Sequence, residues 1–276
     1  MKPAFNISPS PGDQEGKNLL IEVGNYGVSF SWYRNNPNFL EGILVFNFDK
    51  FLTPSEWIGA LNSMYRNYPV LGMPHHSIRV CINFPEFMLI PGEYYNPVNA
   101  RELFSRTFQS GPEFEIITDV LKEEKIFMVY GVRKELYDFF QFHYPNRVML
   151  HASVNEIRSW GKENSITCII YHNAIKIIAC RDGSFQYCGI FSFTKPVDVV
   201  YFLLKVCETY QLYPETIPLK LCGMVDEYSI LYNEVYKYFG IVSFISENEN
   251  FEMQERIRFY PNHFFCHHTI QISCAS

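Results

Sequence analysis

The chain has 276 residues, of which 47% are hydrophobic and 19% are charged. Such a composition is typical of a globular protein with a sizeable core and excludes a largely disordered one. The 29 acidic residues outnumber the 23 Lys and Arg residues, so the net charge is -6. Because nucleic acids and anionic membranes attract basic proteins, neither is expected as a partner.

The N-terminal segment, residues 1–18, has no continuous apolar stretch of the kind found in a secretory signal. No window of the chain approaches the roughly 18 apolar residues that a membrane-spanning helix needs. We therefore expect a flexible N-terminus, a cytoplasmic protein and no insertion into a membrane.

The first structured part of the chain is predicted to be a strand meander. Two apolar runs flank the turn Gly24-Asn25-Tyr26-Gly27, and the three strands are expected at about 19–24, 27–34 and 39–48. A helix follows, because Thr53-Pro54-Ser55-Glu56 supplies an N-cap hydroxyl, an early proline and a capping-box carboxylate. A short apolar run ending near Asn83 is the next expected strand.

Residues 84–125 have no counterpart later in the chain and are predicted to be an inserted subdomain, with a helix at 99–108. Its aromatic residues are more than a small core is expected to bury. The remainder must pack on the main body or on a protein partner, since Tyr and Phe are favoured at interfaces. The candidate partner contacts are Phe87, Tyr94, Tyr95 and Phe104.

The second half repeats the plan of the first, since residues 166–181 align with residues 19–34. Strands are expected at about 166–172, 174–181 and 185–193, followed by a helix with Val199, Phe202, Leu203 and Val206 on one face. A further match is a strand followed by a helix: IFMVYGV and its helix in the first half correspond to KLCGM and its helix in the second. The predicted halves are residues 19–160 and 161–276, each an α/β unit with a mixed sheet.

A duplicated meander followed by helix and strand units resembles the actin, hexokinase and chaperone ATPase superfamily, whose two ribonuclease-H-like halves close over a nucleotide. The inserted segment is similar to the extra subdomain of the bacterial actin-like proteins of cell division and type IV pilus assembly. More narrowly, EFMLIPGEYYNP with a helix after it, then MVYGVRKELYDFFQFHYP, is similar to an uncharacterised Bacteroidetes family known only as a domain of unknown function. The resemblance implies two ribonuclease-H-like halves with mixed sheets, and no particular activity.

In that superfamily an acidic residue and glycines in the first hairpin hold hydrated magnesium and phosphate. Glu22, Gly24 and Gly27 occupy comparable places, and Gly223 is half of the Gly-Gly pair that contacts adenosine in the superfamily. Against this, Glu replaces the usual Asp, no Lys or Gln follows in the turn, and the second hairpin, Tyr171-His172-Asn173-Ala174, has neither an acid nor a glycine. A tight hairpin by itself also explains the glycines.

Other chemistry finds little support. His263 and His267 would share a helix face and could bind zinc, but the flanking phenylalanines favour packing. The eight cysteines are dispersed without a Cys-x-x-Cys pair, which predicts reduced core residues, not disulfides or zinc ligands. No nucleophile motif and no set of carboxylates for two metal ions is present. No catalytic residue and no metal site are therefore predicted.

The leading hypothesis is a non-catalytic scaffold or adaptor of actin-like fold, with decayed nucleotide motifs, no cofactor and another protein as its partner. The alternative is a switch that binds or hydrolyses Mg-ATP in an interdomain cleft lined by Glu22, Gly24, Gly27 and Gly223. A third hypothesis is the binding of a small ligand without phosphate in that cleft.

Overall fold

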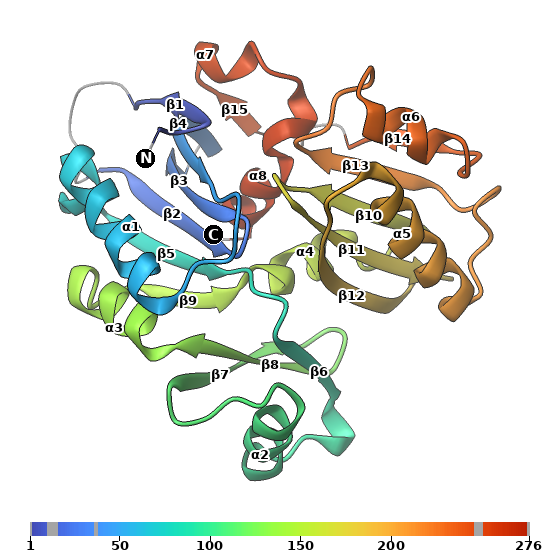
Figure 1. Cartoon of the computed structure of the whole chain (residues 1–276), viewed down its shortest axis with the longest axis horizontal. Coiled ribbons are helices and arrows are strands. Elements are labelled where there is room, and N and C mark those ends of the chain that lie inside the picture. The colour runs from blue at the N-terminus through green and yellow to red at the C-terminus, as the bar shows by residue number, and fades with distance from the viewer. Residues whose placement is uncertain (1, 10–15, 36–37, 246–250, 275–276) are drawn as a thin grey trace. The chain divides into compact units, whose positions relative to one another are not determined.

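The computed structural model describes residues 2–9, 16–35, 38–245 and 251–274. The chain divides into two compact units, one made of Met1–Arg34 with Glu41–Val154 and the other of Asn35–Leu40 with Asn155–Ser276 (Figure 1). Each unit is built around a sheet that contains both parallel and antiparallel strands. The predicted α/β architecture with mixed sheets is confirmed.

The sheet of the first unit has the order β1-β4-β3-β2-β5-β9. Its strands are β1 (Phe5–Ile7), β2 (Asn18–Gly24), β3 (Gly27–Arg34), β4 (Asn38–Asn47), β5 (Ser77–Ile82) and β9 (Val148–His151). β2 and β3 form the predicted hairpin, while β5 runs parallel to β2 and β9 parallel to β5. β2 buries all seven of its residues, including the polar Asn18 and Glu22, which explains why its apolar residues are not confined to alternate positions.

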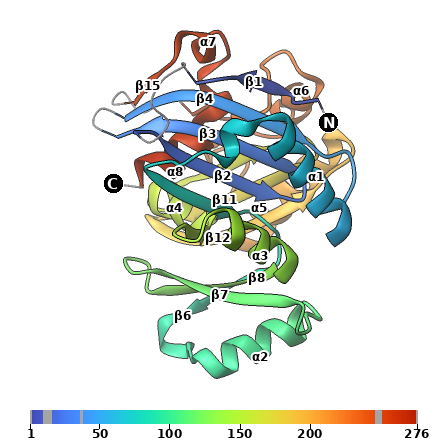
Figure 2. The same cartoon turned by 90° about the vertical axis from the view of Figure 1, so that its left-hand side faces the viewer.

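Two helices of the first unit lie in front of this sheet in Figure 2, α1 (Pro54–Asn67) and α3 (Lys134–His143). The predicted capping box of α1 is confirmed: the Thr53 side chain accepts a hydrogen bond from the Glu56 backbone N–H, and the Glu56 side chain accepts one from the Thr53 backbone N–H. The two helices meet through aromatic rings, with Tyr65 of α1 edge-on to Phe139 of α3 at 5.2 Å. The short η1 (Pro69–Gly72) follows α1.

The inserted subdomain has a sheet of its own, with the order β6-β8-β7. It consists of β6 (Phe87–Pro91), η2 (Gly92–Tyr94), α2 (Pro97–Thr107), β7 (Phe114–Leu121) and β8 (Ile126–Arg133). The helix α2, predicted at 99–108, lies over one face of this sheet (Figure 2) and buries Ala100 and Phe104 against it.

One expectation about this region is wrong. IFMVYGV was matched with KLCGM as a strand of the main sheet, but it forms β8 and pairs with β6 and β7. The subdomain sheet therefore extends to Arg133 instead of ending before residue 126. A strand followed by a helix has the same local pattern in either sheet, and only pairing over long sequence distance distinguishes the two.

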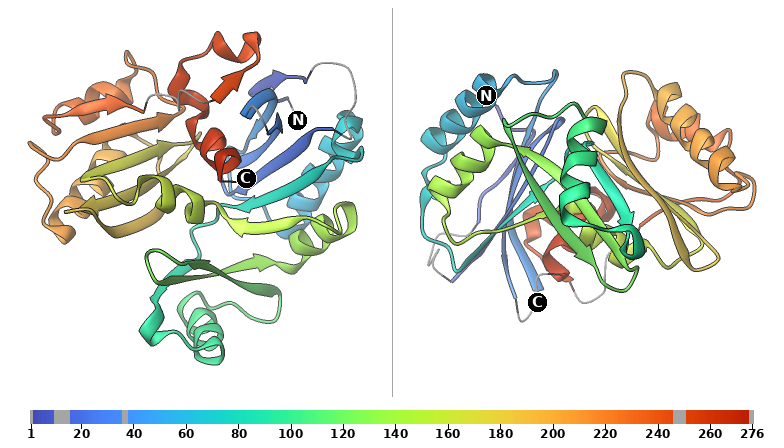
Figure 3. Two further views of the ribbon diagram at one scale, coloured as in Figure 1. Left: turned by 180° about the vertical axis from the view of Figure 1, so that it is seen from behind. Right: turned by 90° about the horizontal axis from the view of Figure 1, so that it is seen from below.

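The sheet of the second unit has the order β12-β11-β10-β13-β14, which repeats β4-β3-β2-β5-β9 of the first unit. Its strands are β10 (Ser165–Ile170), β11 (Ala174–Arg181), β12 (Ser184–Ser192), β13 (Leu219–Gly223) and β14 (Val242–Phe244). The helices α5 (Pro196–Tyr210) and α6 (Ile230–Tyr236) pack side by side over one face (Figure 3). The predicted duplication of the meander, helix and parallel strand is confirmed.

The equivalent of β13 is thus β5, and the equivalent of α6 is α3. The subdomain is inserted between β5 and α3. The helix α6 begins after the N-cap residue Ser229, so Tyr228 precedes it and is exposed, and α6 buries Val235.

The remaining elements complete the two units. They are α4 (Ala152–Trp160), β15 (Phe251–Met253), α7 (Glu255–Arg258), η3 (Asn262–Phe265) and α8 (Cys266–Ser273). β15 pairs in parallel with Asn38–Leu40, the part of β4 that belongs to the second unit. No helix among the described residues is both long enough and apolar enough to cross a membrane.

Two further features differ from expectation. Residues 5–7 of the segment expected to be flexible form β1, which pairs antiparallel with β4; residues 1 and 10–15 of that segment lie outside the described residues. Cys222 and Cys266 form a disulfide, although all cysteines were expected to be reduced. Folding brings the end of β13 to the start of α8 across 44 positions of sequence, which the dispersed cysteine spacing did not reveal.

Candidate functional site

The first hairpin holds the acidic residue that was proposed for magnesium. The Tyr26 hydroxyl donates a hydrogen bond to Glu22 Oε1 at 2.5 Å, and the Asn83 side-chain amide donates to the same oxygen at 3.2 Å. Tyr26 and Asn83 also contact each other directly. The Glu22 side chain is buried, and among the described residues its Oε2 has no hydrogen-bond partner.

The proposed nucleotide-contact glycines are required by the backbone. Gly24 and Gly27 close a two-residue turn, and a Cβ on Gly27 would lie 2.1 Å from the carbonyl oxygen of Phe46. Gly223 has φ +89°, and a Cβ there would lie 2.2 Å from the carbonyl oxygen of Ile170. Both positions therefore need glycine whether or not a nucleotide binds.

The four residues proposed for nucleotide binding are divided between the two units, and the hairpin carboxylate already has hydrogen-bond partners on one of its oxygens. The hairpin supplies a single carboxylate, and one of its oxygens already accepts two hydrogen bonds. Glu22, Gly24 and Gly27 lie together in the first unit, whereas Gly223 ends a strand of the second. The nucleotide-binding role of these four residues stays a prediction.

A pocket of about 390 Å³ lies within the first unit, where the subdomain meets α1 and the start of α3. Its floor is aromatic, with rings from α1, from the segment after β5, from the end of α2 and from β7: Trp57, Phe84, Phe104, Phe108 and Phe114. Trp57 and Phe84 meet edge to face at 5.9 Å, and Phe104 and Phe108 lie 4.7 Å apart. A pocket of this size and lining can bury one or two apolar side chains of a ligand.

Charged groups surround this floor, and most of them are acidic. Three carboxylates line the pocket, those of Glu86, Glu113 and Glu135, against one guanidinium, that of Arg133. Burial raises the pKa of Glu86, and hydrogen bonds from backbone N–H groups lower the pKa of Glu113. Arg133 lies 4.8 Å over the Phe114 ring. The rim therefore favours a ligand with positive charge.

The turn after α2 contributes two polar residues to the pocket. Gln109 is exposed and has φ 50°, a left-handed conformation that ends the helix. Ser110 is buried, and its Oγ has no hydrogen-bond partner among the described residues. A buried hydroxyl without a partner is uncommon in folded proteins, and a ligand in the pocket would supply one.

The four predicted contact residues of the subdomain are placed differently from one another. Phe104 is fully buried in the subdomain core, where its ring also borders the pocket. Tyr95 stacks on Phe127 at 3.8 Å, and Phe87 lies 4.6 Å from the His151 ring. Tyr94 is 74% exposed. Their role in binding a partner stays a prediction.

No local sequence pattern indicated this pocket. Trp57 lies 27 residues before Phe84 and 51 before Phe108, so the three rings belong to segments that are far apart in the sequence. The excess of aromatic residues in the insertion was the one sequence feature that pointed toward this region. The pocket itself forms only where the folded subdomain meets α1.

Residues 8–242 match a family described as "Protein of unknown function (DUF3822)". The chain belongs to this family. The DUF3822 match spans the meander, the subdomain and most of the second unit, and it confirms the family resemblance seen in the sequence.

Solved structures confirm the fold of this DUF3822 chain. A protein from Bacteroides thetaiotaomicron, described as having an actin-like ATPase fold and unknown function, superposes with a TM-score of 0.70 at 21% identity, covering 84% of this chain and 91% of that one. The PilM-PilN type IV pilus biogenesis complex superposes with a TM-score of 0.63 at 10% identity, covering 96% of this chain and 100% of that one. EutJ, an ethanolamine utilization protein from Carboxydothermus hydrogenoformans, superposes with a TM-score of 0.50 at 10% identity, covering 98% of this chain and 92% of that one. A comparison with curated proteins gave no match.

Proposed function

We propose that this actin-like chain is a non-catalytic adaptor that binds another protein through the pocket of its first unit. The observation that carries the proposal is the aromatic floor of that pocket together with its acidic rim. In this proposal Glu22 serves the hairpin, where its Oε1 accepts hydrogen bonds from Tyr26 and Asn83.

The proposed occupant is a segment of a partner protein with an apolar side chain next to Lys or Arg. The apolar side chain would bury itself against Trp57, Phe84 and Phe108, and the positive charge would face Glu113 and Glu135. The volume of about 390 Å³ is at the lower end of the range for ligand pockets, which suits one anchoring side chain. A backbone or side-chain donor of the segment would complete the hydrogen bonding of the Ser110 hydroxyl.

Fold analogy gives this proposal limited additional support. PilM was solved together with PilN, so one protein of this fold is known in a complex with a protein partner. At 10% identity the shared feature is the fold, and the proposed function rests on the pocket of this chain.

The proposal is tested by photocrosslinking in the native cell, with p-benzoylphenylalanine at the exposed pocket residue Gln109 and, as a control, at the exposed Tyr201 of α5. We expect a specific crosslinked protein from Gln109 and not from Tyr201. Glu135→Lys should reduce that crosslink, while Glu227→Lys, which makes the same charge change outside the pocket, should not. No crosslink at Gln109, or the same products from both positions, would contradict the proposal.

Thermal unfolding with and without millimolar Mg-ATP distinguishes the adaptor proposal from the alternative hypothesis, an ATP-dependent switch. A ligand at 100 times its dissociation constant stabilises a protein by about 2.7 kcal/mol. We expect no shift of the unfolding temperature. An upward shift that is present in the wild type and lost in Glu22→Ala would instead support Mg-ATP binding by Glu22, Gly24, Gly27 and Gly223.

A further inference from the structure

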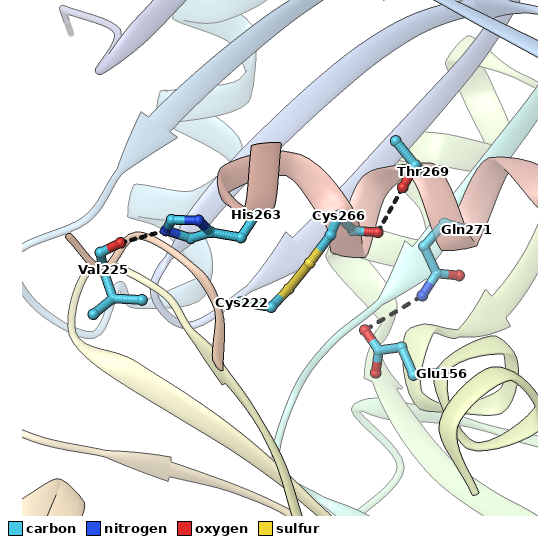
Figure 4. The surroundings of a disulfide bond; sticks show 7 residues. All are labelled: Glu156, Cys222, Val225, His263, Cys266, Thr269 and Gln271. Atoms are coloured by element: carbon cyan, nitrogen blue, oxygen red, sulfur yellow. Dashed lines mark hydrogen bonds between the residues drawn. A yellow bond between two sulfur atoms is a disulfide. The ribbon is translucent and has the colours of Figure 1, made fainter. Parts of the chain in front are cut away.

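Two buried cysteines meet in the second unit. Cys222 lies near the end of β13 and Cys266 is the first residue of α8, and their sulfur atoms are joined in a disulfide (Figure 4). Both side chains are almost fully shielded from solvent. The cysteines are 44 positions apart in sequence, so the pair is a product of the fold.

A histidine completes this cluster. A ring nitrogen of His267 and the two sulfur atoms lie within 4.8 Å of one another. His267 is 5% exposed, and its Nδ1 has no hydrogen-bond partner among the residues that the structure describes. A buried ring nitrogen in this state is uncommon and indicates a missing partner. The other candidate from the sequence, His263, is already used, since its Nε2 lies 2.7 Å from the carbonyl oxygen of Val225.

We propose that the reduced protein binds one Zn²⁺ ion through the thiolates of Cys222 and Cys266 and the imidazole of His267. Two sulfur ligands and one nitrogen ligand are a donor set that zinc prefers, with a fourth position open to water. The two thiolate charges balance the charge of the ion, which makes burial of the site less costly than burial of a net charge.

One of the three proposed ligands, Cys266, also lines a second cavity of about 590 Å³, together with Thr269 and Ile270 of α8. This cavity lies within the second unit, and Ser159, Ser243 and Ser273 give it a partly polar wall. It offers a path for the ion and for the water that would occupy the fourth position.

Metal binding and the disulfide exclude each other. A cellular dithiol transfers two electrons to the disulfide, is itself oxidised to a disulfide, and leaves two thiols on Cys222 and Cys266. Zinc then replaces the two thiol protons, and the sulfur atoms move apart to their usual distance of about 2.3 Å from the metal. In the opposite direction, a cellular disulfide accepts two electrons from the bound thiolates, is itself reduced to a dithiol with two protons from water, and leaves Cys222 and Cys266 joined as a disulfide, so that the zinc ion is released. In either state β13 stays linked to α8.

The test uses the whole chain, reduced and freed of metal by a chelator, and titrated with Zn²⁺ against a chromophoric competitor. We expect one zinc ion per reduced chain and none in the oxidised chain. His267→Ala should weaken zinc affinity at least about tenfold, a loss seen even when groups beyond the ligands are removed. Cys222→Ser should weaken it further, whereas Cys274→Ser, the control at a free and partly exposed cysteine, should bind zinc as the wild type does.

Two measurements on the wild type keep the proposal testable if a variant does not fold. Cobalt(II) in place of zinc should give a thiolate charge-transfer band in the near ultraviolet. Bound zinc should protect Cys222 and Cys266 from alkylation, as read by peptide mass spectrometry, but should leave Cys274 reactive. Failure of the reduced wild type to bind zinc, or undiminished binding by folded Cys222→Ser, would overturn the proposal.

Discussion

Among single residues, those of the first hairpin resemble a phosphate-binding site, yet they also have structural roles in the hairpin. The Glu22 carboxylate accepts hydrogen bonds from Tyr26 and Asn83, which join β2, its turn and the residue after β5. Gly27 lets β3 approach the carbonyl of Phe46. Glu22 and Gly27, two residues that suggested phosphate binding, therefore have structural roles inside the first unit.

Gly27→Ala is predicted to destabilise the first unit by at least about 2 kcal/mol, because its Cβ would meet backbone and its positive φ is strained for an L-residue. Urea unfolding measures this. The control is Gly59→Ala in α1, where a Cβ meets nothing within 4 Å and where Ala should stabilise the helix by about 0.5–1 kcal/mol. Unchanged stability of Gly27→Ala would show that this glycine is not needed by the hairpin.

The capping box of α1 predicts a dependence of stability on pH. Hydrogen bonds from Lys50 and Thr53 lower the pKa of Glu56 from 4.5 to about 2. The ionised carboxylate therefore stabilises the fold fully above pH 4.5, and this contribution is lost as the pH falls toward 2.

The check is the unfolding temperature of Glu56→Gln against the wild type over this pH range. The variant should be less stable at neutral pH, and the two curves should converge in acid. Glu93→Gln, an exposed position in η2, is the control and should follow the wild type throughout. A constant difference between Glu56→Gln and the wild type at all pH values would contradict the prediction.

At the scale of elements, the subdomain is a small sheet covered by one helix, and its core is correspondingly thin. Ala100, Phe104 and Val129 form the buried cluster between this helix and the sheet, and Tyr95 packs against it. Gly131 makes room for Phe104, since a Cβ there would lie 2.8 Å from that ring. In such a small core, neighbouring aromatic residues can differ strongly in burial.

The neighbouring residues Tyr94 and Tyr95 are predicted to behave differently when changed to Ala. Tyr95 stacks on Phe127, and its hydroxyl donates a hydrogen bond to Thr118 Oγ1 at 3.4 Å, so Tyr95→Ala should destabilise the subdomain by about 1–3 kcal/mol. Tyr94 is exposed, and Tyr94→Ala should change stability by less than about 0.5 kcal/mol. Denaturant unfolding compares them; equal losses would mean that Tyr94 is also packed.

At the scale of the whole molecule, the duplicated sheet order gives each unit its own buried core. In the second unit, residues of β10, β11, β13, α5 and α6 form one apolar cluster, including Ile166, Leu203, Leu221 and Val235. The disulfide lies in this unit and closes a long loop. Its stabilising effect should therefore be confined largely to the unit that contains it.

Reduction of the Cys222–Cys266 disulfide in metal-free buffer is predicted to destabilise the second unit by about 2–4 kcal/mol, because it restores freedom to the unfolded chain. Hydrogen exchange followed by mass spectrometry should show faster exchange in β13 and α8 and unchanged exchange in β2, β3 and β5. Faster exchange throughout both units would show that they unfold together. The Cys222→Ala variant should show no response to reduction.

Local patterns in the sequence predicted the repeated plan and several of its details. Apolar runs separated by tight turns predicted both meanders, and Thr53 with Glu56 predicted the start of α1, because these signals act between residues close in sequence. The family resemblance rested on longer motifs of the same kind, and the DUF3822 match and the actin-like neighbours confirm it.

Contacts between residues far apart in the sequence became visible only in the folded chain. It assigned Ile126–Arg133 to the subdomain sheet, placed Trp57 beside Phe84 and Phe108 in the pocket, and brought Cys222 to Cys266 and His267. Propensity and periodicity report the conformation of a segment, whereas strand partners, pockets and ligand clusters depend on packing across the fold. For this protein the architecture was therefore readable from local pattern, and the candidate sites were not.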